Sequence, residues 1–253
     1  MSKQNIYDNN HFFEEYKALR DKKNNANVLI EKPAFLSLLP NLKDKTILDL
    51  GCGFGEACVE YINLGAKNVI GIDISKRMLE VANLFNKDDK IEYINMPIED
   101  INKLDLKFDI ICSSLVLHYI SDYKGLVNKI YNTLNKDGYF IFSIEHPLGS
   151  TYQDGRGPRW EKDENGNKVC SRLFDYCIEG KRLSKWFDIA VEKYHRTFQT
   201  ILNSLIEVGF SIDKILEPIL SEEEMKKYPE FMDNYHRPDF LLIKAYKNWI
   251  IYQ

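Results

Sequence analysis

A glycine-rich loop follows a short β-rich run near residue 50, and an acidic residue ends the next such run. The loop is Gly51-Cys52-Gly53-Phe54-Gly55, and the acidic residue is Asp73. Glycines allow positive φ angles and a close approach of the backbone to a ligand. A carboxylate about 20 residues beyond such a loop can accept hydrogen bonds from ribose hydroxyls. This pattern predicts a site for a ribose-containing ligand at one edge of a parallel sheet.

The spacing of the loop argues against a dinucleotide. In the pattern GxGxxG the third glycine would fall at position 56, which is Glu56 in this chain. A carboxylate at the start of the helix would repel a pyrophosphate bound there. The alternative interpretation is a purely structural turn followed by an incidental Asp73.

Three histidines form a second group of candidate catalytic residues. His118 and His146 follow two β-rich runs, at 108–112 and 139–144, and so leave the predicted sheet at the same edge. His195 lies beside Arg196 near the predicted start of a helix. A histidine can act as a general base near neutral pH. A hydrogen-bonded structural histidine is the alternative for each, and a structural salt bridge is the alternative for Arg196.

The elements that position these residues alternate between strand and helix, as in a parallel sheet flanked by helices. We expect a doubly wound α/β fold with a helical segment over residues 1–40 and a core over 41–147 and 197–253. The predicted strands and helices follow in order. Strands are expected at 46–50, 68–73, 91–94, 108–112, 139–144, 210–216 and 239–245, and helices at 56–64, 75–84, 122–134 and 197–208, with a turn at 135–138.

The alternation stops over residues 148–196, where turn signals and aromatic residues accumulate. This segment is too short for an independent core, so we expect an aromatic-rich cap inserted into the core domain. A cap of this kind would suit a flat or apolar substrate and exclude water. Trp160 and Tyr176 from the cap, Arg196 beside it and Tyr119 from the core are the candidate substrate contacts. The alternative is that the aromatic residues build a small core within the cap.

Composition narrows the function classes. The chain has 253 residues, a net charge of −4 and a pI near 5.8, which argues against nucleic acid as a bulk partner. No segment is apolar for the roughly 18–20 residues that span a bilayer, and the first residues lack the apolar core of a signal peptide. Five cysteines without a CxxC pair predict neither disulfides nor a metal site. We expect a cytoplasmic protein, monomeric or homodimeric, without a membrane partner.

The glycine loop, Gly71-Ile72-Asp73-Ile74-Ser75 with Met78-Leu79, and the stretch from Phe108-Asp109 to His118-Tyr119 resemble the class I S-adenosylmethionine (SAM)-dependent methyltransferases. The resemblance covers residues 41–147. It implies a seven-stranded Rossmann-like sheet whose last strand runs antiparallel. It also implies SAM as cofactor, with S-adenosylhomocysteine as product.

The resemblance also assigns cofactor contacts. Gly51 and Gly53 would lie near the methionine moiety, and Asp73 would bind the ribose. Pro97 stands where the family often has an acid beside adenine, so the Ile98 backbone and the Glu99 side chain are expected there instead. An N-terminal segment with Tyr16 and Arg20 would fold over the cofactor; an ordinary amphipathic helix is the alternative. The remaining expected contacts are Cys52, Ile74, Met78 and Ser113.

The second half, with Glu145-His146-Pro147, Lys193 to Thr197 and Arg237-Pro238, is similar to a bacterial small-molecule methyltransferase subfamily that includes the toxoflavin-biosynthesis N-methyltransferase. The resemblance implies in-line SN2 methyl transfer to nitrogen or oxygen of a small molecule. The sequence motif typical of enzymes that methylate amines of DNA or RNA bases is absent after the fourth predicted strand. A methyltransferase acting on RNA or protein and a non-catalytic SAM-binding protein stay open as alternatives.

Overall fold

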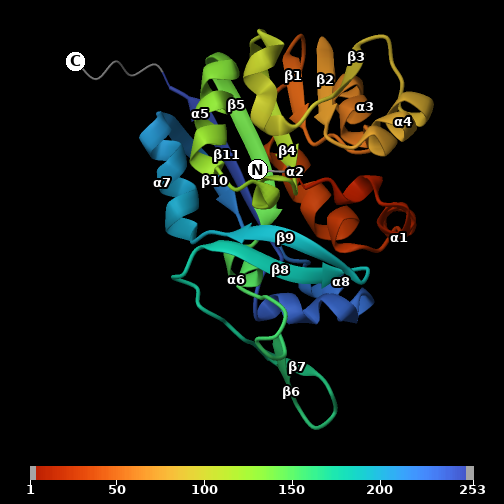
Figure 1. Ribbon diagram of the computed structural model, residues 1–253, viewed down its shortest axis with the longest axis vertical. Coiled ribbons are helices and arrows are strands. Elements are labelled where there is room, and N and C mark those ends of the chain that lie inside the picture. Colours follow the sequence, from red (N-terminus) through yellow and green to blue (C-terminus); the bar gives the residue numbers. More distant parts are fainter. Residues whose placement is uncertain (1–3, 249–253) are drawn as a thin grey trace.

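The computed structural model describes residues 4–248, and its centre is a seven-stranded sheet (Figure 1). The strand order is β10-β11-β5-β4-β1-β2-β3. Strands β1 to β5 run parallel to one another, and β11 runs antiparallel to both β5 and β10. The strands are β1 Thr46–Leu50, β2 Asn68–Asp73, β3 Ile91–Asn95, β4 Phe108–Ser114, β5 Leu134–Glu145, β10 Phe210–Leu216 and β11 Phe240–Lys247. The predicted doubly wound, mostly parallel sheet is confirmed.

Helices cover both faces of the sheet because alternate side chains of each buried strand point to opposite faces. Leu48 of β1 packs in one core and its neighbour Ile47 in the other. The first core includes side chains of η3 Ile98–Leu104, α5 Tyr123–Thr133 and α7 Phe198–Val208. The second includes side chains of α2 Lys32–Leu38, α3 Glu56–Asn63, α4 Lys76–Phe85 and α8 Glu222–Lys227.

The segment before the sheet is mostly helical over its described part, as the sequence predicts; residues 1–3 lie outside the described residues. It comprises η1 Ile6–Asp8, α1 Asn10–Arg20, the π-helical turn η2 Asn27–Glu31, and α2. Asn9 caps α1 by accepting a hydrogen bond from the Phe12 backbone. In Figure 1, α1 lies beside the cap rather than against the centre of the sheet.

Two hairpins and a short helix form the insertion between β5 and α7. They are α6 Pro147–Ser150, the pair β6 Trp160–Lys162 and β7 Lys168–Ser171, and the pair β8 Gly180–Trp186 and β9 Ile189–His195. The β8–β9 hairpin crosses one end of the sheet, and β6–β7 projects away from the molecule (Figure 1). The loop after β4 contains η4 Leu117–Tyr119, and η5 Pro229–Tyr235 precedes β11.

The turn expected at 135–138 is an irregularity inside a longer strand. Leu134 pairs with Phe108 and Tyr139 with Ile110, so four residues of β5 have no matching partners on β4. Asp137 in this insertion has a φ of 58°. The strand therefore begins at Leu134, before the turn, whereas the sequence predicts its start at Tyr139.

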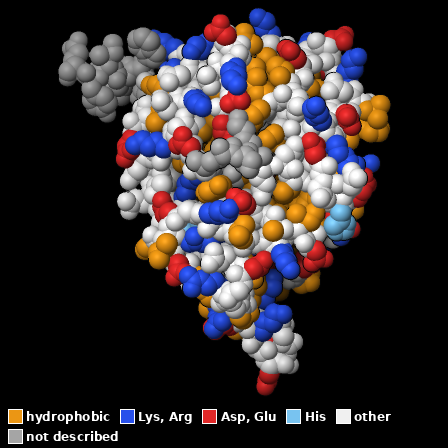
Figure 2. Space-filling view, in the orientation of Figure 1, with side chains coloured by type: hydrophobic (Ala, Val, Ile, Leu, Met, Phe, Trp, Pro, Cys, Tyr) orange, Lys and Arg blue, Asp and Glu red, His pale blue; other side chains and the backbone are white. Residues whose placement is uncertain are grey.

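The surface is of mixed charge. Figure 2 shows acidic and basic side chains interspersed on the face in view, without a large area of one sign. Within residues 4–248, no helix is both long and apolar enough to cross a bilayer. Cys52, Cys58 and Cys112 are buried.

Candidate functional site

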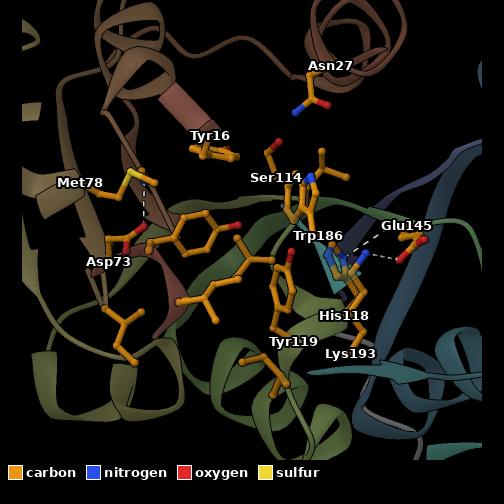
Figure 3. A pocket seen from close by; sticks show the side chains of 18 of the residues that line it. Tyr16, Asn27, Asp73, Met78, Ser114, His118, Tyr119, Glu145, Trp186 and Lys193 are labelled. Atoms are coloured by element: carbon orange, nitrogen blue, oxygen red, sulfur yellow. Dashed lines mark hydrogen bonds and ion pairs between the residues drawn. The ribbon is translucent and has the colours of Figure 1, made fainter. Parts of the chain in front are cut away.

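A cavity of about 680 Å³ lies where the parallel strands end, between the sheet, the N-terminal segment and the β8–β9 hairpin. Figure 3 shows that side chains from all three parts point into it. The position agrees with the general rule that open α/β sheets bind ligands outside the carboxyl ends of their strands. We call the part around Gly51, Gly53 and Asp73 the cofactor half, and the part around His118, Glu145 and Lys193 the acceptor half.

The glycine loop has the open backbone that the sequence predicts. Gly51 and Gly53 have φ angles of +74° and +55°, which residues with a side chain rarely adopt. A Cβ at Gly51 would lie 2.4 Å from a methyl carbon of Val116, whereas a Cβ at Gly53 would meet nothing within 4 Å. The first glycine therefore permits close packing of two loops, and the second leaves open space at the cavity wall.

Asp73 is fixed at the edge of the same loop. Its Oδ2 accepts a hydrogen bond from the Gly53 backbone at 2.9 Å, and its Oδ1 accepts one from the Ser75 backbone at 2.8 Å. Burial raises the pKa of this carboxyl, and the two backbone donors oppose that rise. Each carboxylate oxygen has a further lone pair, so Asp73 can still accept two hydroxyl hydrogen bonds. The buried, oriented carboxylate fits a ribose.

The N-terminal segment closes over the cofactor half. The Tyr16 ring lies 6.1 Å from the Phe54 ring of the glycine loop and 5.9 Å from the Trp186 ring of the cap. Arg20 lines the cavity and forms an ion pair with Glu56. Burial raises the pKa of Tyr16 to about 12, so its hydroxyl stays protonated.

Asp49 is a cavity residue that the sequence analysis did not single out. Its carboxyl is almost fully buried, and the thiol of Cys58 lies 3.5 Å from Oδ2. Burial raises the pKa of Asp49 to about 7, and the charges of Asp73 and Glu31 act in the same direction. A ligand ammonium group at this point would supply the missing positive charge. Asp49 lies two residues before Gly51 at the end of a predicted strand, and this position was the signal in the sequence that could have identified it.

Ten of the eleven expected cofactor residues line the cavity. They are Tyr16, Arg20, Gly51, Cys52, Gly53, Asp73, Ile74, Met78, Ile98 and Glu99. Ser113 does not: it is fully buried, and its hydroxyl donates to the Leu50 carbonyl at 3.1 Å. Its neighbour Ser114 lines the cavity instead, because successive side chains of a strand point to opposite faces.

The acceptor half holds a histidine and an ion pair. His118 and Tyr119 from η4 line the cavity, together with Glu145 at the end of β5 and Lys193 of β9. The Lys193 ammonium lies 2.9 Å from the Glu145 carboxylate (Figure 3). Burial alone would raise the pKa of Glu145, but the charge and hydrogen bond of the adjacent Lys193, together with contributions from His118 and Arg159, lower the pKa to about 2. Glu145 is therefore ionised at neutral pH.

His118 is neutral and holds one tautomer. The Glu145 backbone N–H donates to Nδ1 at 3.4 Å, which leaves the ring proton on Nε2. Burial lowers the pKa of His118 to about 3, and the Lys193 charge acts in the same direction. A neutral ring with hydrogen on Nε2 can donate a hydrogen bond from that nitrogen, but it cannot accept a proton there.

His146 and His195 do not line the cavity. His146 Nδ1 accepts a hydrogen bond from the Leu148 backbone at 3.2 Å, and its Nε2 lies 2.7 Å from Glu217, so the ring caps α6. Both ring nitrogens of His195 lie 2.8 Å from hydrogen-bonding oxygens, those of the Ser150 hydroxyl and the Tyr176 carbonyl. Of the three candidate catalytic histidines, the structure brings His118 alone to the cavity.

Three of the four expected substrate contacts also lie off the cavity. Trp160 packs its ring against the Arg237 guanidinium, 5.0 Å away. The Tyr176 hydroxyl accepts a hydrogen bond from the Phe198 backbone at 2.9 Å and so anchors the start of α7. Arg196 donates to the Ile120 and Ser121 carbonyls, and thereby holds the loop after β4. Tyr119 lines the cavity, as expected.

Five further residues complete the acceptor half and were not identified from the sequence. Glu145 and Arg237 were visible as parts of the motifs compared with the small-molecule subfamily. Lys193 was visible in the same way, and Trp186 as one of many cap aromatics, whereas nothing in the sequence singled out Arg159. These residues are Glu145, Arg159, Trp186, Lys193 and Arg237.

The chain also matches a known family in sequence. Residues 48–142 match the methyltransferase domain family, and this stretch contains the glycine loop, Asp73 and His118. A SAM-dependent methyltransferase from Mesorhizobium loti is 34% identical, with 88% of this chain and 99% of that chain covered and a TM-score of 0.78. The chain belongs to the SAM-dependent methyltransferases. It is an enzyme of that class, and SAM is its cofactor.

Two other similar proteins extend over most of this methyltransferase. A Listeria monocytogenes structure described as a SAM-dependent methyltransferase is 40% identical, with 86% of this chain and 96% of that chain covered and a TM-score of 0.78. An uncharacterized protein of Haemophilus influenzae is 42% identical over 97% of this chain and 98% of its own length. The similarity thus includes the cap and the N-terminal segment.

The narrower resemblance to the toxoflavin-biosynthesis enzyme is distant. The 1,6-didemethyltoxoflavin-N1-methyltransferase of Burkholderia thailandensis is 17% identical, with 94% of this chain and 85% of that chain covered and a TM-score of 0.55. At this identity the likeness shows the fold alone. The methyltransferase family is therefore confirmed, and the subfamily stays a prediction.

Proposed function

We propose that this methyltransferase acts on a small molecule by in-line transfer to nitrogen or oxygen. The supporting observation is that the N-terminal segment contacts the β8–β9 hairpin over the acceptor half. Gln4 exchanges two hydrogen bonds with the Glu192 backbone of β9, at 2.8 and 3.2 Å. The Phe12 ring contacts the Trp186 ring at the end of β8, with the centroids 5.3 Å apart. A cavity of about 680 Å³ lies within the roughly 300–1,000 Å³ of small-molecule sites.

The cofactor half fits SAM. SAM supplies a methyl group on a positively charged sulfur that is an excellent leaving group. Gly53 gives it an open backbone surface, Asp73 is oriented for the ribose, and the uncompensated Asp49 carboxyl suits an ammonium group. The chain itself must then align the acceptor and exclude water, and such positioning can contribute about 7–11 kcal/mol.

The acceptor half favours an acceptor atom that needs no base. The His118 tautomer presents N–H rather than a free lone pair at Nε2. Glu145 is paired with Lys193 and is a weak base because its pKa lies near 2. We therefore propose that the attacking atom carries a free lone pair on binding, as an amine, a ring nitrogen or an oxygen already ionised. His118 and Tyr119 would orient it by hydrogen bonds.

Labelled methyl transfer tests this function. The protein is incubated with methyl-labelled SAM and, separately, with the small-molecule, RNA and protein fractions of a bacterial extract. The proposal predicts label in the small-molecule fraction, and its loss with Asp73→Asn. Label in the RNA or protein fraction alone would replace the proposed substrate class. SAM binding without transfer to any fraction would instead indicate a non-catalytic protein.

A further inference from the structure

Two arginines line the acceptor half without a matching set of acceptors. Arg237 is 5% exposed, and its Nε is enclosed without a hydrogen-bond partner. Among the residues that the structure describes, its one hydrogen bond runs from Nη2 to Asp239 at 3.5 Å, which is weak for a group with five donors. The Arg159 side chain has no hydrogen bond or ion pair to any residue within 4–248; its guanidinium lies over the Tyr152 ring at 4.6 Å.

The carboxylates of the same region are already engaged. Glu145 is paired with Lys193 at 2.9 Å, and Glu192 with Lys181 at 2.5 Å. Asp239 accepts a hydrogen bond from the Asn234 amide at 3.1 Å in addition to its long contact with Arg237. Asp239 is thus the carboxylate left to offset the two guanidinium groups, and this wall of the cavity carries an excess of one positive charge.

The surrounding chain is built to hold Arg237 in this position. A Cβ at Gly149 would lie 2.5 Å from its Nη1, so a side chain at that position would displace the guanidinium. The Trp160 ring lies 5.0 Å from the guanidinium carbon. Burial lowers the pKa of Arg237, and the charge of Arg159 lowers it further. An ionised guanidinium enclosed with one weak bond is unfavourable unless an anion joins it.

We infer that Arg159 and Arg237 bind an oxyanion of the methyl acceptor, a carboxylate or a phosphate, and this inference rests on the proposed function. Guanidinium groups match both oxyanions through paired N–H donors. The oxyanion would lie on the wall formed by β6, η5 and the start of β11, away from the glycine loop. It fixes the acceptor at one end and leaves the attacking atom near His118 and Tyr119.

The test separates the extract before the reaction. Small molecules are passed over a quaternary-amine anion exchanger at about pH 11, where amines are uncharged and carboxylates and phosphates are ionised. The retained and flow-through fractions are each returned to neutral pH and incubated with the protein and methyl-labelled SAM. The inference predicts labelled product from the retained fraction. An acceptor found in the flow-through would overturn it. Alkaline phosphatase treatment of the retained fraction abolishes the acceptor if the oxyanion is a phosphate and preserves it if it is a carboxylate.

Matched variants test the residues. Arg159→Gln should reduce transfer to the retained acceptor at limiting concentration about tenfold or more, because a charge-assisted hydrogen bond is lost. Arg156→Gln, three residues away and paired with Asp175 outside the cavity, should stay within about twofold of the parent. The parent and both variants should bind S-adenosylhomocysteine with equal affinity by calorimetry, which shows that the fold of each variant is intact.

Equal transfer by the Arg159→Gln and Arg156→Gln proteins would contradict the inference even if the acceptor is anionic. Failure of the proposed function has a different signature. In that case neither small-molecule fraction accepts label, with or without the exchanger step, and the inference falls with it.

Discussion

The Lys193 ammonium lies 2.9 Å from the Glu145 carboxylate, so an ion pair ties the cap strand β9 to the end of the sheet strand β5. The two side chains are 20% and 19% exposed, and removal of either partner leaves a poorly solvated charge. We expect Lys193→Met and Glu145→Gln each to lower the free energy of unfolding by about 2 kcal/mol. Urea unfolding of both single variants and the double variant measures this loss.

The double variant should recover at least half of the summed loss, because no unpaired charge remains. Lys124 and Glu207 provide the control pair, since their side chains are 62% and 55% exposed. Lys124→Met should cost less than about 1 kcal/mol. Strictly additive losses at 145 and 193 would show that the pair is not coupled.

His118 should act as a hydrogen-bond donor rather than a base. Its pKa of about 3 lies far below neutrality, so it stays neutral from pH 5 to pH 9. We expect His118→Asn to lower kcat/KM for the acceptor about tenfold, the cost of one hydrogen bond, with the KM for SAM unchanged. The ratio of parent to variant should be constant over this pH range. A ratio that rises through pH 6–7 would identify His118 as a base instead.

Asp49 should make stability depend on pH in the ligand-free protein. Its folded pKa of about 7 exceeds the ordinary value of 3.8 because the carboxyl is buried. The folded state therefore favours the protonated carboxyl. The contribution of Asp49 to the free energy of unfolding is complete below pH 4 and is lost as the pH rises through 7. Relative to the parent, Asp49→Asn should gain up to about 4 kcal/mol between pH 4 and pH 8.

Urea unfolding at several pH values measures that difference. Asp89→Asn, at an exposed position, controls for the loss of a carboxylate as such. If the difference between the Asp49→Asn protein and the parent does not change with pH, then Asp49 is ionised in the folded protein, and the proposed ammonium contact loses its support.

Gly51 should tolerate no side chain. Gly51→Ala imposes both a positive φ and a Cβ 2.4 Å from Val116. Gly155→Ala is the matched control, because Gly155 has a φ of +84° with nothing within 4 Å of its Cβ position. We expect about 1 kcal/mol of destabilisation at 155, and at least about 2 kcal/mol more at 51, by thermal or urea unfolding. Equal costs at the two positions would show that the contact with Val116 relaxes freely.

The sequence predicted the cofactor half better than the acceptor half for a physical reason. Gly51 and Asp73 follow consecutive parallel strands, so strand topology alone brings them together. Ser113 was misplaced by one residue because a strand reverses its side-chain direction at each step, and the sequence pattern left the direction undetermined for two adjacent serines. The cavity-facing residue is Ser114.

The acceptor half depends on contacts that no local pattern encodes. His195 was as plausible a catalytic candidate as His118, but its ring bonds to the Ser150 hydroxyl outside the cavity. Trp160 was a plausible substrate contact, but its ring packs against Arg237 instead. Lys193 reaches Glu145 across 48 residues of sequence, a distance at which pairing is set by how the cap folds back. Sequence spacing could identify the cap but not its inward-facing side chains.

Calorimetry with S-adenosylhomocysteine tests the central claim most directly. Asp73 is held by the Gly53 and Ser75 backbones at 2.9 and 2.8 Å, in position for the ribose. The parent and the Asp89→Asn control should bind with equal affinity, and Asp73→Asn should bind at least about tenfold more weakly, since hydrogen bonds to a charged group are lost. Unchanged affinity in the Asp73→Asn protein, or no binding by the parent, would contradict the account.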